Sequence, residues 1–203
     1  MIGVRFSLFP LRDDFAPIIL GAVNGIEALG VDVETDDIST CLLGAEPALF
    51  EAVRVAFGRA ARGGTHVALS ATFSAGCPGE PDGDVCVPRA YDGPSGGEEG
   101  WSTEAYDLPD SVAAQFALYP LGAYPYMDTI YAEIARVKQG PVRVVGRHFC
   151  THLYGQGTEV MDVIRRAFAA AQGQAIHTVM TVTLSANSPS LRQQPRLVDQ
   201  TAQ

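Results

Sequence analysis

The sequence is short of cysteine and of positive charge, and both shortages narrow the class of protein. Lysine and arginine together number 14 against 23 aspartates and glutamates, which leaves a net charge of −9. A charge of this sign argues against nucleic acid or an anionic membrane surface as a partner. The cysteines show no C-x-x-C pair and no zinc-finger spacing, so free thiols in a reducing cytoplasm are expected. They are Cys41, Cys77, Cys86 and Cys150.

Long apolar runs and catalytic signatures are missing as well. The chain has no run of 18 apolar residues that would insert into a membrane. Its first 15 residues place Pro10 and several charges where a signal peptide has its apolar centre, so we predict a cytoplasmic protein. The sequence contains no P-loop, G-x-G-x-x-G turn, G-x-S-x-G or H-E-x-x-H motif, and we therefore predict that it is not an enzyme.

What the sequence does contain is an internal duplication. HVALSATFSAGCP at 66–78 returns as HTVMTVTLSANSP at 177–189. An offset of 111 residues aligns 37–78 with 148–189 without a gap, and 12 of these 42 positions are identical. We therefore predict repeats at residues 1–78 and 113–189, a linker rich in Gly, Pro and acid at 79–112, and a disordered tail at 190–203.

Each repeat has the pattern β-α-β-β-α-β. The first is predicted to contain a strand at 4–9, a helix from Asp13 or Asp14 to about Leu29, a helix at 46–61 and a strand from His66. Residues 31–43 are predicted to form a hairpin that turns at Asp36-Asp37, with a single bent strand as the alternative. The second is predicted to repeat these elements at 113–119, 126–137, 142–145, 148–154, 158–171 and 177–186. This order predicts an α+β protein of tandem ferredoxin-like domains, each an antiparallel four-stranded sheet with helices on one face.

The sheet face without helices is predicted to be rich in hydroxyl groups. In the last strand of each repeat, one set of alternating residues is apolar, while the other set includes Thr72 and Ser74, or Thr183 and Ser185. Hydroxyls donate and accept hydrogen bonds, so this face suits a small heterocycle with groups of both kinds. A solvated face, or a polar packing seam between two sheets, is the alternative that the sequence leaves open.

Five segments occur in order around the duplication: RFSLFPLRDDF (5–15), TDDISTCLLG (35–44), ATFSAGCPGEPDGD (71–84), QFALYPL (115–121) and MTVTLSANSPS (180–190). Together they resemble the YkoF family of thiamine- and hydroxymethylpyrimidine-binding proteins. The resemblance covers nearly the whole chain except the centre of the linker and the tail. It implies a homodimer, one small-ligand site per repeat and no cofactor besides the ligand. It also implies a cytoplasmic role in salvage of the pyrimidine precursor of thiamine, linked to an uptake transporter.

The aminopyrimidine ring of such a ligand carries an exocyclic amine donor beside ring-nitrogen acceptors. Asp36 or Asp37 is expected to accept from the amine, and the hydroxyls are expected to bond to either kind of group. Phe9, Tyr119 or Tyr124 is expected to stack on the ring. The copies share few polar lining residues beyond three hydroxyl pairs, so two unequal sites are expected. The predicted ligand-binding residues are Ser7, Phe9, Asp36, Ser39, Thr40, Thr72, Ser74, Tyr119, Thr151, Thr183, Ser185 and Asn187.

A metal site is one alternative to this function. His148, Cys150 and His152 alternate along one predicted strand and therefore point to one side. Side chains on the same face of a flat strand are spaced about 6.6–7 Å apart, which is too far for one zinc ion to bind all three readily. Two of them together with a distant fourth group remain a possible ligand set.

A nucleophilic serine would make the chain an enzyme, but the spacing within each strand is unfavourable. Ser74 and Ser185 each lie eight residues after a histidine, His66 or His177, on the same predicted strand. That spacing is about 26 Å, beyond hydrogen-bond reach. A regulatory or interaction module of ferredoxin-like fold, without a ligand of its own, also stays open, because the fold alone does not choose the function.

Overall fold

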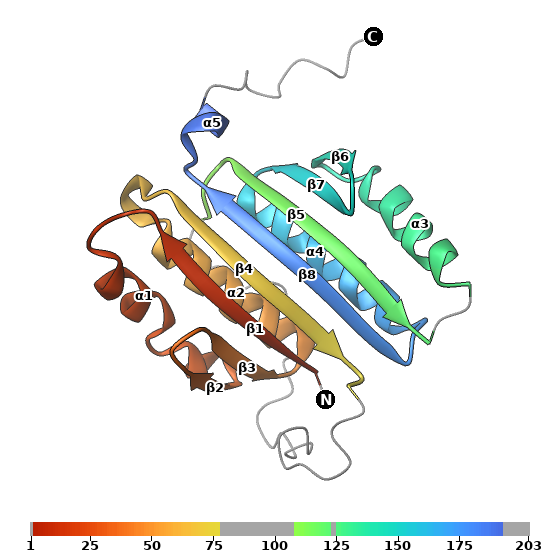
Figure 1. The fold of residues 1–203 in the computed structure, drawn as a ribbon, viewed down its shortest axis with the longest axis horizontal. Helices are drawn as coiled ribbons and strands as arrows, with labels where there is room; N and C mark the ends of the chain where they lie inside the picture. Colours follow the sequence, from red (N-terminus) through yellow and green to blue (C-terminus); the bar gives the residue numbers. More distant parts are fainter. Residues whose placement is uncertain (1, 78–107, 123–124, 193–203) are drawn as a thin grey trace.

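The computed structural model describes residues 2–77, 108–122 and 125–192, which form the two predicted ferredoxin-like repeats (Figure 1). The first repeat consists of β1 (Ile2–Pro10), α1 (Phe15–Val23), η1 (Ile26–Leu29), β2 (Val31–Thr35), β3 (Thr40–Gly44), α2 (Glu46–Ala60), η2 (Arg62–Gly64) and β4 (Val67–Ala75). The second consists of β5 (Val112–Leu121), α3 (Tyr126–Val137), β6 (Arg143–Arg147), β7 (Cys150–Gly155), α4 (Gly157–Gln172) and β8 (His177–Ala186), followed by α5 (Pro189–Arg192). Most of the predicted linker and tail, including Cys86, lies outside the described residues. None of the described helices is both long and apolar enough to cross a membrane.

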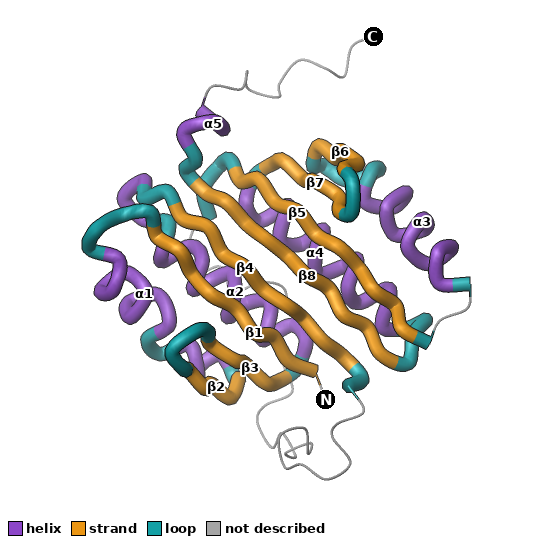
Figure 2. The backbone as a smooth tube through the Cα atoms, in the orientation of Figure 1, coloured by secondary structure: helices purple, strands orange, loops and turns teal. Residues whose placement is uncertain are grey.

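The two repeats share one antiparallel sheet, whose strand order is β2-β3-β1-β4-β8-β5-β7-β6 (Figure 2). β4 and β8 pair from Val67↔Ala186 to Ala75↔Thr178 and so join the repeats side by side. A separate sheet in each repeat was expected from the sequence, and the continuous sheet corrects that expectation. Each of these strands would be an edge strand in a four-stranded sheet, and their pairing satisfies backbone groups that would otherwise face solvent.

The described helices of the two repeats cover one face of this sheet. In Figure 1, α2 and α4 lie behind the central strands, and the opposite face looks toward the viewer. The burial of β4 follows this arrangement: Val67, Leu69 and Phe73 are buried, whereas Ser70 and Thr72 are exposed. The buried residues of both repeats form one hydrophobic cluster, so the molecule has a single continuous core.

The first helix is shorter than predicted. α1 ends at Val23 because Gly25 adopts a left-handed conformation with φ of 74°, and the short η1 follows. Asp14 occupies the N-cap position, but its carboxylate makes no capping bond. It accepts instead from the Nε and Nη2 of Arg12, at 2.8 and 2.9 Å. The prediction of one continuous helix to Leu29 was therefore wrong beyond Val23.

The hairpin of the second repeat also differs from its prediction, whereas the hairpin at Asp36-Asp37 is confirmed. Phe149 has a positive φ of 68°, so His148 and Phe149 form the turn and β7 begins only at Cys150. The predicted strand at 148–154 was therefore wrong at its start. His148 therefore does not lie on the strand face that carries Cys150 and His152, so the three side chains do not alternate along one strand as the metal alternative assumed.

Gly76, just after β4, is expected to be the costlier of two glycines to replace with alanine. Its φ is +79°, and an added Cβ would collide with the carbonyl oxygen of Ile176. Gly25 has nearly the same φ, +74°, with nothing within 4 Å of the added atom. Gly25→Ala therefore carries only the left-handed penalty and should lower the free energy of unfolding by about 1–2 kcal/mol. Gly76→Ala should lower the free energy of unfolding by the same left-handed penalty and by about 1–3 kcal/mol more, because the added Cβ overpacks the site. Urea unfolding measures both, and equal losses would contradict the collision.

Candidate functional site

A hollow of about 540 Å³ opens on the uncovered face of the first repeat, between β1, β3, β4 and the β2–β3 turn. Four predicted residues, Ser7, Ser39, Thr72 and Ser74, contribute to its lining. Small-molecule sites typically enclose roughly 300–1,000 Å³, so the hollow has the size of such a site. The hydroxyl-rich face predicted from the sequence is therefore a shaped depression in this repeat rather than a flat solvated surface.

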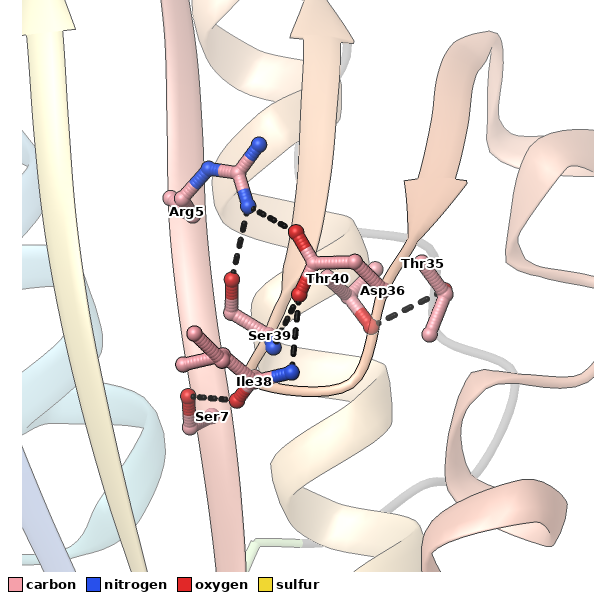
Figure 3. A network of polar contacts seen from close by, with 7 residues as sticks. All are labelled: Arg5, Ser7, Thr35, Asp36, Ile38, Ser39 and Thr40. Atoms are coloured by element: carbon pink, nitrogen blue, oxygen red, sulfur yellow. Dashed lines mark hydrogen bonds and ion pairs between the residues drawn. The ribbon is translucent and has the colours of Figure 1, made fainter.

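Arg5 of β1 ties the β2–β3 turn to the strand beside it (Figure 3). Its Nη1 donates to Oδ2 of Asp36 at 2.6 Å and to Oγ of Ser39 at 2.8 Å. The other oxygen of Asp36, Oδ1, accepts from the backbone N–H groups of Ile38 and Ser39, both at 2.8 Å. One carboxylate thus closes the turn on itself and attaches it to β1.

Two further hydroxyl contacts hold the same turn. Ser7 donates from Oγ to the carbonyl oxygen of Ile38 at 2.8 Å, and the hydroxyls of Thr35 and Thr40 lie 3.1 Å apart (Figure 3). The side chain of Ile38 is 84% exposed although it lines the hollow. The turn is therefore a preformed wall with an apolar residue at its tip.

The network keeps the carboxyl group of Asp36 ionised down to low pH. Hydrogen bonds from the Ile38 N–H, the Arg5 guanidinium and the Ser39 N–H lower the pKa of Asp36 to about 2. Because the pKa of Asp36 is lower in the folded chain than the ordinary aspartate value of about 3.9, its ionised form stabilises the fold at any pH above about 3.9. This stabilisation is lost as the pH falls through about 2.

We expect a ¹³C NMR titration of the Asp36 carboxyl to show a midpoint near 2, because all three donors favour the charged form. In an Arg5→Met variant the midpoint should rise, since one of those donors is gone. A midpoint in the wild-type chain close to that of a free aspartate would contradict the network.

Serine–histidine pairs cross the seam between the repeats. Oγ of Ser74 lies 3.0 Å from Nε2 of His177, and Oγ of Ser185 lies 3.4 Å from Nε2 of His66. Neither contact was predicted, because only a serine and a histidine on the same strand were considered from the sequence, whereas each contact joins residues of two different strands. Among the described residues no hydrogen bond joins either imidazole to a carboxylate, so the pairs lack the orienting acid of a catalytic triad.

Three predicted residues are not at this face. Thr40 and Thr151 are only 5% and 6% exposed and lie on the helix side of the sheet, because Thr40 is in register with the buried Phe6. The side-chain amide of Asn187 donates to the carbonyl oxygens of Ala61 and Thr65, at 3.0 and 2.9 Å. It therefore connects the end of β8 to the first repeat instead of lining the hollow.

The five remaining predicted residues lie outside the lining of the hollow. Asp36 is one of them and holds the β2–β3 turn beside the hollow, and the other four lie on the uncovered face. Phe9 and Tyr119 are about half exposed on β1 and β5. Thr183 and Ser185 lie on the same face of β8, in the second repeat.

The predicted list omitted several residues that shape the hollow. Arg5 shares a strand face with Ser7, and that alternation was readable from the sequence, but its pairing with Asp36 was not. Cys41 and Cys77 also line the hollow, and both are free thiols. Burial is the main cause that raises the pKa of Cys41, which favours the neutral and less nucleophilic thiol.

The second repeat does not reproduce the ion pair. Gln115 takes the place of Arg5, and Cys150 takes the place of Ser39. The Sγ of Cys150 approaches Oε1 of Gln115 at 3.9 Å, and Nδ1 of His152 lies 3.3 Å from the hydroxyl of Tyr154. Within the described ranges no three His, Cys, Asp or Glu residues gather as metal ligands. The two faces therefore differ in charge and in hydrogen-bonding groups.

A second hollow, of about 430 Å³, lies between α1 and the end of α2. Three arginines line it, and the contacts of two of them are structural: Arg12 pairs with Asp14, and Arg59 donates from Nη1 to the carbonyl oxygens of Ala22 and Asn24 at 3.3 and 2.6 Å. Arg59 thus satisfies carbonyl groups at the end of α1. The hydroxyl-lined hollow on the open face remains the stronger candidate site.

The fold and this hollow define a duplicated ferredoxin-like protein with a site of small-molecule size. The sequence model of the YKOF-related family matches residues 1–80 and 111–191, and the chain belongs to this family. "Putative HMP/thiamine-binding protein YkoF" of Bacillus subtilis (strain 168) is 35% identical over 189 residues, which cover 93% of this chain and 91% of that relative. The resemblance seen in the sequence is confirmed.

Solved structures similar to parts of the chain include protein SP2199 of Streptococcus pneumoniae and a domain of unknown function, DUF77, from Bacillus cereus. The first has a TM-score of 0.35 at 21% identity and covers 36% of this chain and 83% of its own. The second has a TM-score of 0.34 at 21% identity and covers 37% of this chain and 74% of its own.

Proposed function

We propose that this protein binds thiamine or its hydroxymethylpyrimidine half without chemically changing it. The observation that carries the proposal is the hollow on the open face, which is lined by hydroxyls and closed by a turn attached to β1. The 35% identity to a relative named for binding these compounds supports this choice of ligand. The ligand-bearing units in this proposal are residues 1–78 and 113–189, joined by 79–112.

The groups of the hollow match an aminopyrimidine. Asp36, in the turn beside the hollow, stays ionised at neutral pH, and a carboxylate only accepts hydrogen bonds, as the exocyclic amine requires. Thr72 and Ser74 can donate to ring nitrogens or accept from the amine. Arg5, which also lines the hollow, carries a guanidinium group that only donates hydrogen bonds and bonds to the turn through Nη1. The net charge of −9 suits the fixed positive charge of the thiazolium ring of thiamine.

The second repeat is proposed to hold a weaker or differently selective site. Its face keeps Thr183 and Ser185 but has Gln115 in place of Arg5. The ion pair of the first repeat is replaced there by the contact between Cys150 and Gln115, so less of this site is preformed.

A second copy of the chain is the proposed partner at the open face. Ile38 and Phe149 occupy the same repeat position at the two hairpin tips and are 84% and 97% exposed. Phe9 and Tyr119, also equivalent, add two half-exposed aromatic rings. Exposed apolar groups arranged by internal symmetry suit a two-fold related copy. Light scattering of the purified chain decides this, because a monomer mass would exclude the dimer.

We place the activity in the cytoplasm, in salvage of the pyrimidine precursor of thiamine and beside an uptake transporter. This role rests on the family resemblance. Deleting the gene should impair growth on limiting hydroxymethylpyrimidine but not on abundant thiamine. Unchanged growth on limiting precursor would remove the salvage role while leaving ligand binding open to direct measurement.

Calorimetric titration of the metal-stripped chain with thiamine and, separately, hydroxymethylpyrimidine tests the proposal. We expect saturable heat with about two sites per chain. Thr72→Val and Thr183→Val should each weaken one site by about three- to tenfold, because each removes one hydroxyl while keeping the side-chain shape. The absence of heat with both compounds would overturn the ligand assignment, and zinc would then be titrated to test for a metal site.

A further inference from the structure

Each repeat supplies a histidine to a serine of the other repeat. Ser74, which lines the hollow of the first repeat, is bonded to His177 of the second, and Ser185 of the second repeat is bonded to His66 of the first. The same contact thus occurs twice, at opposite ends of the β4–β8 seam. All four side chains are partly buried, so solvent competes only in part for these bonds.

The duplication and the antiparallel register produce both contacts together. In each copy the serine follows the histidine by eight residues. β4 and β8 run in opposite directions, so the start of one strand lies beside the end of the other. Ser74 is in register with Val179, two residues after His177, and the diagonal neighbour on one sheet face is within reach of a long side chain.

We infer that His177 is a positioning residue for the ligand site of the first repeat, acting through Ser74, and that His66 has this role for the second repeat through Ser185. Each site is then complete only when the other repeat is folded beside it. The inference rests on the proposed function, because it concerns the same ligand sites.

The chemical effect of the histidine is to determine whether the serine hydroxyl donates a hydrogen bond to the ligand or accepts one. When Ser74 donates its hydrogen to Nε2 of His177, it presents only lone pairs to a ligand. When it accepts a hydrogen from Nε2, its own hydrogen is left to donate. The histidine therefore decides whether Ser74 faces the amine or a ring nitrogen of an aminopyrimidine, and it removes the rotational freedom of the hydroxyl before binding.

Calorimetry with thiamine tests the role of the histidine in binding. His177→Ala should weaken the site of the first repeat by about three- to tenfold. His177→Gln, which keeps a polar group near the position of Nε2, should recover a large part of the loss. Because the histidine acts through the serine, the Ser74→Ala/His177→Ala double variant should bind no more weakly than Ser74→Ala alone. His66→Ala is the reciprocal variant: it should weaken the site of the second repeat and leave that of the first unchanged.

Nitrogen-15 NMR of the histidine rings, recorded without ligand, tests the hydrogen bonds directly. Ser74→Ala should shift the ring nitrogens of His177 and not those of His66, and Ser185→Ala should do the reverse. Thermal unfolding of each variant identifies any loss of fold.

The outcomes separate this inference from the proposed function. If the wild-type chain binds thiamine but His177→Ala binds it equally well, or the two substitutions have additive effects, the positioning role is overturned. The positioning role would also be overturned if the nitrogen-15 shifts of the histidine rings stayed unchanged in the serine variants. If the wild-type chain binds neither thiamine nor hydroxymethylpyrimidine, the proposed function fails and the positioning role fails with it, whereas the ring shifts still decide whether the seam bonds exist.

Discussion

Replacing Phe168 with alanine is expected to lower the free energy of unfolding by about 3–5 kcal/mol, the usual cost of removing a buried phenylalanine. Phe168 lies on α4 of the second repeat and is 0% exposed. Its ring packs on Phe50 and Phe73 of the first repeat, with centroids 5.9 and 5.8 Å away. Those two rings are themselves stacked at 4.2 Å. The substitution therefore opens a cavity at the junction of both repeats.

A total stability of roughly 5–15 kcal/mol is typical of a folded domain, so this loss would be a large part of it. Because the core is continuous across the junction, both repeats should still unfold in one cooperative transition. Chemical unfolding followed by circular dichroism measures the loss. Phe9→Ala is the control, since Phe9 is 50% exposed and should cost far less. A loss for Phe168→Ala as small as that of the control, or separate transitions for the two repeats, would contradict the shared core.

Arg5→Met is expected to weaken thiamine binding at the first repeat by about tenfold or more, equivalent to about 1.4 kcal/mol. Methionine keeps much of the side-chain length but removes the bonds to Asp36 and Ser39 that attach the turn to β1. The wall of the hollow would then have to be ordered when the ligand binds, at a cost to affinity. Calorimetry with thiamine measures the change.

The control for this prediction is Gln115→Met, the equivalent position in the second repeat, which should leave the first site unchanged. The unfolding midpoint of Arg5→Met should move little, because Arg5 and Asp36 are about half exposed and surface ion pairs contribute little to stability. Unchanged affinity in Arg5→Met would show that the turn does not take part in binding.

Ser7 and Thr72 show that alternation along a strand is enough to predict which face of the sheet a side chain lies on. Both were assigned to the open face from alternation alone, and both line the hollow. Thr40 shows where that reasoning fails. It was grouped with Ser39 as a candidate, but neighbouring residues of a strand point to opposite faces, and its register with Phe6 places it on the buried side.

The ion pair between Arg5 and Asp36 and the serine–histidine pairs were beyond the reach of the sequence. Arg5 and Asp36 are 31 residues apart, and Ser74 and His177 are 103 residues apart. No local pattern reports which strands become neighbours at such separations. The seam between β4 and β8 forms because two edge strands pair. A strand with alternating polar and apolar residues can pair with many other strands, so its sequence does not identify its partner.

By itself, the sequence determined that the chain contains two copies of one α+β unit and that a hydroxyl-rich sheet face recurs in both. Identity at a constant offset and alternation with period two are properties of residues close along the chain, so they can be read without coordinates. Only the tertiary structure decided that the copies share one sheet, that the first repeat has a hollow held by an ion pair, and that each repeat lends a histidine to the other. Those features depend on the register of backbone hydrogen bonds between distant strands, which alternation alone leaves unspecified.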